Sequence, residues 1–142
     1  MDTQVRKLDY DNIDPEIMKE AGDIIRAGGL VAFPTETVYG LGGDALNPQS
    51  SMKIYAAKGR PSDNPLIVHI EERADLYKIA KKVPEKAEKM MDAFWPGPLT
   101  LIFPKTDRVP SETTGGLDTV AVRMPSDGIA AAFIRAAGGF IA

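Results

Sequence analysis

The alternation of short apolar runs with capped helical segments is the feature that most constrains the fold. Asp14 followed by Pro15 predicts a helix start, Asn47 followed by Pro48 repeats that signal, and Ser126 is expected to cap a later helix. Between the helical segments lie apolar runs that predict strands, at residues 30–33, 66–70, 99–103 and 119–124. Helices interleaved with short strands indicate an α/β or α+β fold, and we expect a twisted mixed β-sheet flanked by helices.

Length and composition place the chain among single globular domains. Its 142 residues are enough for one hydrophobic core, 44% of them are hydrophobic and 26% are charged. The sequence contains no cysteine, which excludes a disulfide framework and a thiolate metal site. No apolar run approaches the roughly 18 residues that a membrane span requires, and the N-terminus has no signal-peptide pattern. We therefore expect one domain over residues 1–142, in the cytoplasm and without membrane association.

Two cations, Lys58 and Arg60, flank Gly59 where the second predicted helix ends. Cations at a helix C-terminus are stabilised by the helix dipole, by about 0.3–1 kcal/mol, without any ligand. The same pair suits a phosphate or a carboxylate, because arginine offers a planar fork and lysine a point charge. The formal net charge of −3 argues against a broad basic surface, so an anion would bind in a local pocket. The spacing alone leaves both interpretations open.

Hydroxyl groups follow the first predicted strand, and the sole histidine lies on the strand predicted over residues 66–70. Residues 34–43 carry Thr35, Tyr39 and three glycines just after an apolar run, which is where ligands bind in open α/β sheets. The glycine spacing matches neither a P-loop nor a dinucleotide fingerprint. Threonines also stabilise turns, and a lone histidine on a strand such as His69 is more often a hydrogen-bonded core residue than a catalyst. A single histidine without cysteine predicts no metal site.

Every second residue of the strand predicted over residues 119–124 faces the same side. One face carries Thr119, Ala121 and Arg123. An arginine among small residues indicates the open floor of a pocket rather than a packed core.

Six sequence blocks occur together in one order: PTETVYGLG (residues 34–42), KGRP (58–61), NPL (64–66), His69, WPGPLT (95–100) and VRMP (122–125). With these blocks the chain resembles the YrdC/Sua5 family of threonylcarbamoyl-adenylate synthases over roughly residues 12–142. The combination is specific, although no single block would be.

The resemblance implies an enzyme that forms threonylcarbamoyl-AMP and pyrophosphate from L-threonine, bicarbonate and ATP, with Mg²⁺ on the ATP phosphates. The product serves the t6A modification of tRNA. The resemblance further implies a large concave pocket on the twisted sheet. It also implies RNA as a partner, since some family members bind double-stranded RNA.

The resemblance assigns the site residues by position. Lys58 and Arg60 match the first half of the family's Lys-x-Arg…Ser-x-Asn signature, and we expect them to be the catalytic and nucleotide-binding cations. The residues expected to bind threonine are Thr35, Tyr39, His69, Thr119 and Arg123.

The Ser-x-Asn half of the signature is not reached before Ala142. Residues 140–142 are expected to begin a further strand, in a domain that is incomplete at its C-terminus and impaired in activity. An exposed sheet edge there would let two copies associate. Two alternatives stay open: a YrdC-like module that binds RNA or a nucleotide without catalysis, and a relative that forms carbamoyl-adenylate.

Overall fold

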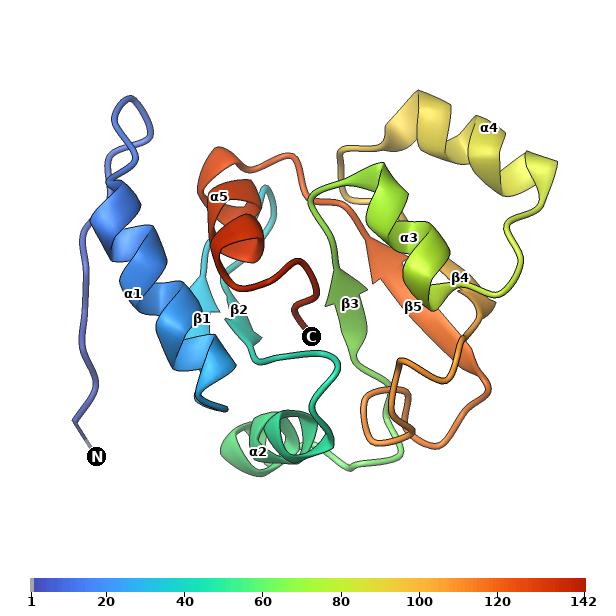
Figure 1. Cartoon of the computed structure of the whole chain (residues 1–142), viewed down its shortest axis with the longest axis horizontal. Coiled ribbons are helices and arrows are strands. Elements are labelled where there is room, and N and C mark those ends of the chain that lie inside the picture. The colour runs from blue at the N-terminus through green and yellow to red at the C-terminus, as the bar shows by residue number, and fades with distance from the viewer. Residues whose placement is uncertain (1) are drawn as a thin grey trace.

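The computed structural model of the protein describes residues 2–142, within which five helices accompany two β-sheets (Figure 1). Helices α1 (Pro15–Arg26) and α5 (Gly128–Ala136) pack beside the first sheet, and α3 (Arg73–Ile79) and α4 (Glu85–Phe94) pack beside the second. The structure confirms the predicted class of helices flanking a mixed sheet. The strands form two sheets, however, and not the single sheet that we expected.

Two helices begin where the sequence predicts, because a side chain just before each helix satisfies a free backbone N–H group. The Asp14 carboxylate caps α1 (2.9 Å), and the Asn47 side-chain oxygen caps α2 (Pro48–Lys58; 3.0 Å). Gly59 then ends α2 in the left-handed conformation, with a φ of 61°.

The predicted cap of the last helix is wrong by one residue. Asp127, and not Ser126, accepts the backbone N–H of Ala130 (2.9 Å) at the start of α5. Both residue types cap helices, but the aspartate adds a negative charge that the helix dipole favours. The Tyr10 hydroxyl also donates to the Asp127 carboxylate (2.7 Å), which fixes this side chain further.

The strands form a hairpin and a three-stranded mixed sheet. In the hairpin, β1 (Val31–Phe33) pairs antiparallel with β2 (Gly40–Gly42). In the second sheet, the central β5 (Thr119–Arg123) pairs in parallel with β3 (Ile67–His69) and antiparallel with β4 (Thr100–Pro104). The parallel pair brings residues more than 50 positions apart in the sequence next to each other.

The glycine-rich segment forms a strand where the sequence predicts only a loop. Because Gly40–Gly42 is β2, the loop is confined to residues 34–39. A Cβ on Gly42 would lie 2.7 Å from the Ile141 side chain and 2.9 Å from the Phe33 ring. Glycine at this position therefore permits close packing, and its backbone is committed to the hairpin.

Residues 140–142 join the two sheets. Ile141 pairs with Asp44, just after β2, and with His69 in β3. The His69 N–H donates to the Ile141 carbonyl oxygen (2.6 Å), and all three joining residues are buried. The prediction of an exposed sheet edge at these residues is wrong, since they have neighbours on both sides. Self-association of the chain stays a prediction.

Two apolar cores lie on either side of this junction. One lies between the three-stranded sheet and helices α2, α3 and α4, and includes Trp95, whose indole N–H donates to the Leu99 carbonyl oxygen (2.8 Å). The other lies between β1 and helices α1 and α5. Because α3 and α4 cover only one face of the three-stranded sheet, its other face is left for the candidate site.

Candidate functional site

The candidate site begins on the face of the three-stranded sheet that α3 and α4 leave uncovered. Thr119, Ala121 and Arg123 of β5 lie on this face, and the strand register places His69 of β3 beside Arg123. All four are partly exposed, whereas the alternate residues of β5 are buried in the core. The neighbouring Ile102 of β4 is 69% exposed. The predicted alternation of the strand is confirmed, and the large concave pocket stays a prediction.

The loop at residues 34–39 carries two of the predicted threonine-binding residues. The Thr35 hydroxyl donates to the Val38 carbonyl oxygen (2.6 Å) and lies 3.1 Å from the Thr37 hydroxyl. Thr35 thus holds the loop in its turn, which is the local role that its residue type favours. Tyr39, by contrast, is 77% exposed at the end of the loop.

An ion pair ties this loop to the sheet. The Arg123 guanidinium donates to the Glu36 carboxylate (3.1 Å), and both side chains are about 85% buried. A second Arg123 contact reaches the Thr37 hydroxyl at 3.5 Å. Glu36 is the site residue that the sequence analysis missed. The available signal was an acidic residue between two threonines, three residues after an apolar run.

His69 lies among charged and aromatic groups beside Arg123. Its Nδ1 is 3.2 Å from the Ile67 carbonyl oxygen, and its ring meets the Phe33 ring edge-on at 5.8 Å between centroids. Burial lowers the pKa of His69, and the positive charge of Arg123 lowers it further, against the raising effect of the backbone carbonyls and of Glu36. The imidazole is therefore neutral at pH 7 and offers one donor and one acceptor nitrogen.

Arg60 lies near the start of β3, at the end of the strands opposite to Arg123, and Lys58 precedes it by two residues at the end of α2. Arg60 donates to the Pro65 carbonyl oxygen (2.6 Å), just before β3, while Lys58 is exposed at the end of α2. Thr119 begins β5 on this same side, because β3 and β5 run in parallel. Thr119 and Arg123 are four residues apart, about 13 Å at the usual strand rise. The predicted residues thus form two groups, one at each end of the strands.

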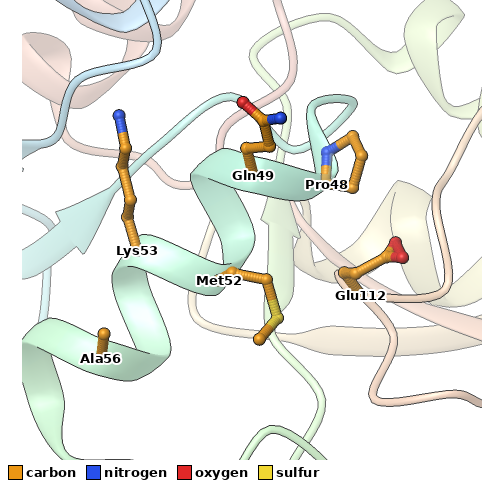
Figure 2. A pocket seen from close by; sticks show the side chains of 6 residues that line it. All are labelled: Pro48, Gln49, Met52, Lys53, Ala56 and Glu112. Carbon is orange, nitrogen blue, oxygen red and sulfur yellow. The ribbon is translucent and has the colours of Figure 1, made fainter.

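A shallow depression elsewhere on the surface contains none of the predicted site residues (Figure 2). It lies along α2, where Lys53 donates to the Gly28 carbonyl oxygen (2.7 Å). Its lining residues are Pro48, Gln49, Met52, Lys53, Ala56 and Glu112. With one lysine and one glutamate among largely uncharged side chains, it lacks the paired cations that a phosphate chain requires.

The described part of the chain offers neither a cluster of metal ligands nor a helix that could span a membrane. Within residues 2–142, His, Cys, Asp and Glu side chains form no group of three or more that would hold a metal ion. None of the helices in this range has the length and apolar character needed to cross a bilayer.

Comparison with known proteins assigns the chain to a family. The Sua5/YciO/YrdC family model, described as "Telomere recombination", matches residues 23–142. The chain belongs to this family. The matched range includes every predicted site residue, from Thr35 to Arg123, and the resemblance drawn from the sequence blocks is confirmed.

Individual relatives are threonylcarbamoyl-AMP synthases. The one from Pyrococcus abyssi is 57% identical over 115 residues, covering 81% of this chain and 34% of the relative. The one from Bacillus subtilis is 53% identical over 126 residues, covering 88% of this chain and 36% of the relative. The family member described here therefore spans about a third of the length of these curated relatives.

A solved structure of P. abyssi Sua5 complexed with L-threonine has the same fold. Its TM-score is 0.89 at 52% sequence identity, and the match covers 92% of this chain and 38% of that one. The match supports the arrangement of helices around the hairpin and the three-stranded sheet.

Proposed function

We propose that the chain forms part of an L-threonylcarbamoyladenylate synthase, which makes threonylcarbamoyl-AMP and pyrophosphate from L-threonine, bicarbonate and ATP. The observation that carries this proposal is the uncovered sheet face, with Arg123 beside His69 at one end of the strands and with Arg60 held against the Pro65 carbonyl near the start of β3. Membership of the family, the names of its relatives and the threonine complex of P. abyssi Sua5 support it. The product would serve t6A modification of tRNA in the cytoplasm.

The chemistry requires charge neutralisation more than a nucleophilic side chain. The threonine amine takes up bicarbonate as a carbamate with loss of water, and the carbamate oxygen then attacks the α-phosphorus of ATP, which expels pyrophosphate. Two anions must approach each other in this step. Lys58 and Arg60 would bind the phosphates, together with the Mg²⁺ that accompanies ATP, and would stabilise the charge that develops on the leaving pyrophosphate.

The other end of the face would bind the amino acid. Arg123 supplies a cation for the threonine carboxylate, and the neutral imidazole of His69 offers a hydrogen bond to the threonine hydroxyl. The Thr35 hydroxyl donates to the Val38 carbonyl oxygen and accepts from the backbone N–H groups of Thr37 and Val38 (3.3 Å each), so Thr35 would border the subsite as part of the loop. Tyr39 would line the entrance of the threonine subsite, and Thr119 would lie between the threonine and the nucleotide. Thr119 and Arg123 are about 13 Å apart along β5, a separation consistent with a product of the aminoacyl-adenylate type that extends from an amino acid to a nucleotide.

The test is a calorimetric titration of the chain with L-threonine, with and without Mg²⁺-ATP, and with L-valine as the near-isosteric control. We expect valine to bind at least about a hundredfold more weakly, because it leaves buried polar groups without partners. Equal binding of the two amino acids would exclude a threonine subsite on this face.

The cations at the nucleotide end are tested separately. We expect Lys58→Ala and Arg60→Ala each to weaken Mg²⁺-ATP binding about tenfold or more, since each removes a charged hydrogen-bond donor. Lys81→Ala is the matched control, because Lys81 is exposed in the turn between α3 and α4. Pyrophosphate release should fall in the same two variants. Unchanged ATP affinity and unchanged release in both would refute the assignment.

Two other activities stay secondary. RNA binding without catalysis would give an RNA affinity that is indifferent to threonine, and the net charge of −3 offers it no broad electrostatic support. A carbamoyl-adenylate activity would use carbamoyl phosphate as its carbamoyl source and would release pyrophosphate without threonine. The threonine dependence of pyrophosphate release therefore separates all three.

A further inference from the structure

The ion pair between Glu36 and Arg123 is incompletely hydrogen-bonded. One guanidinium nitrogen of Arg123 donates to Oε1 of Glu36 at 3.1 Å. The second oxygen, Oε2, and the Nε of Arg123 are both buried and have no hydrogen-bond partner within residues 2–142. Buried charged atoms without partners are destabilising, so each such atom in a native structure requires an explanation.

The other Arg–Glu pairs of the described chain are complete. Arg135 contacts both oxygens of Glu71, at 3.1 and 2.9 Å, and Arg6 contacts both oxygens of Glu20, at 3.0 and 2.8 Å. This bidentate arrangement is the usual geometry of the guanidinium–carboxylate pair. Glu36 and Arg123 depart from it although Glu71 has a similarly buried side chain. An ion pair with a purely structural role would not be stabilised by leaving two of its atoms without hydrogen-bond partners.

The two unpartnered atoms match the charged groups of an amino acid. A carboxylate oxygen accepts a hydrogen bond from an ammonium or amine, and a guanidinium N–H donates to a carboxylate. An α-amino acid carries these two complementary groups on neighbouring atoms. A cation alone would bind any carboxylate, whereas a cation beside an anionic oxygen selects ligands that also carry an amino group.

We propose that Glu36 determines the specificity of the threonine subsite, with Oε2 accepting a hydrogen bond from the amino group while Arg123 Nε donates to the carboxylate. This inference rests on the proposed function. The carbamate formed from threonine keeps one N–H on the same nitrogen, so the contact with Glu36 persists through the reaction. Glu36 is thereby a specificity and positioning residue that aligns the carbamate for attack on the nucleotide.

The test compares L-threonine with 3-hydroxybutyrate, which keeps the carboxylate and the hydroxyl but lacks the amino group. Both are titrated by calorimetry into the wild-type chain, Glu36→Gln and Glu71→Gln. We expect the wild type to prefer threonine at least about tenfold. Glu36→Gln should lose most of its threonine affinity and treat the two ligands alike. Glu71→Gln makes the same change in a complete ion pair outside the site and should behave as the wild type.

Each outcome decides between the two proposals. Wild-type binding of 3-hydroxybutyrate as tight as that of threonine, or an unchanged preference in Glu36→Gln, overturns the role of Glu36 and leaves the proposed function standing. No threonine binding by the wild type overturns both. If Glu36→Gln does not fold, Glu36→Asp keeps the charge, and the wild-type comparison of the two ligands still applies. If the wild type and a folded Glu36→Asp each bind threonine and 3-hydroxybutyrate with equal affinity, the proposal is rejected.

Discussion

At the residue scale, His69 shows how a side chain is tuned by what surrounds it. Its strand position is readable from the sequence, but its protonation is not, because the groups responsible come from distant parts of the chain. Burial in the folded protein and the nearby guanidinium of Arg123 both lower its pKa. The position of His69 fits both interpretations of a lone histidine, as a hydrogen-bonded core residue and as a site residue. Its ring is hydrogen-bonded to the backbone, and it also borders the uncovered face.

The lowered pKa of His69 predicts a pH-dependent stability. As the pH falls below about 6.5, the unfolded chain takes up a proton at this residue before the folded chain does. The free energy of unfolding should therefore fall between that pH and the lowered folded pKa, and this contribution should be absent at higher pH. The measurement is urea unfolding from pH 5 to pH 8 for the wild type and His69→Gln.

The carboxylates are common to the wild type and His69→Gln, so their contributions to the free energy of unfolding cancel when the two proteins are compared. We expect the stability of the wild type relative to His69→Gln to increase from pH 5 to pH 7 and then level off. A difference that is constant over the whole range would contradict the lowered pKa.

At the element scale, the helices could be predicted and the hairpin could not. The starts of α1 and α2 depend on caps one residue away, Asp14 and Asn47, so a local pattern is sufficient. The cap of α5 was misplaced because two adjacent residues are both competent, and the contact of Asp127 with Tyr10 bridges 117 positions. Two of the three residues of strand β2 are glycines, which have little strand propensity, and only its pairing with β1 makes it a strand.

The packing around β2 predicts the effect of a single methyl group. Gly42→Ala would place a Cβ within 3 Å of both Ile141 and Phe33, which are buried and cannot move away freely. We expect the free energy of unfolding to fall by about 1–3 kcal/mol, as for other overpacked sites. Chemical denaturation measures it directly.

Gly128→Ala provides the matched control for this substitution. Gly128 begins α5, and the nearest atom to a Cβ there would be the Ile13 Cδ1 at 3.8 Å. Alanine at this position should be neutral or stabilise the protein by up to about 1 kcal/mol. Equal effects of the two substitutions would mean that Gly42 is not constrained by its neighbours.

At the scale of the whole molecule, the candidate site depends on contacts across the junction between the two sheets. The alternation of β5 predicted that Thr119 and Arg123 share a face, but the partner of Arg123 is Glu36, 87 positions earlier in the chain. No periodicity in the sequence connects these positions. The sequence also does not show that the site residues lie in two groups at opposite ends of the strands, because this division follows from the parallel pairing of β3 with β5.

Ile141 is the side chain that holds this junction together, and its removal should loosen it. The residue is fully buried, packs against Gly42 in the hairpin and hydrogen-bonds through its backbone to His69 in β3. We expect Ile141→Ala to lower the free energy of unfolding by about 2–5 kcal/mol, because it leaves a cavity between the sheets. Ile102→Ala, at a position that is 69% exposed, should cost less than about 1 kcal/mol.

Hydrogen exchange localises the change that Ile141→Ala causes. The amide of His69 donates to the Ile141 carbonyl oxygen and that of Gly43 to the Ala142 carbonyl oxygen (2.6 and 3.2 Å), so both report on the junction. In Ile141→Ala these two amides should lose more protection than the amides within the β4–β5 ladder. The loop that carries Glu36 would then be less firmly held against Arg123, and threonine affinity should fall along with the protection. Uniform loss of protection over both sheets would instead mean that the molecule opens as a single unit and that Ile141 does not stabilise the junction in particular.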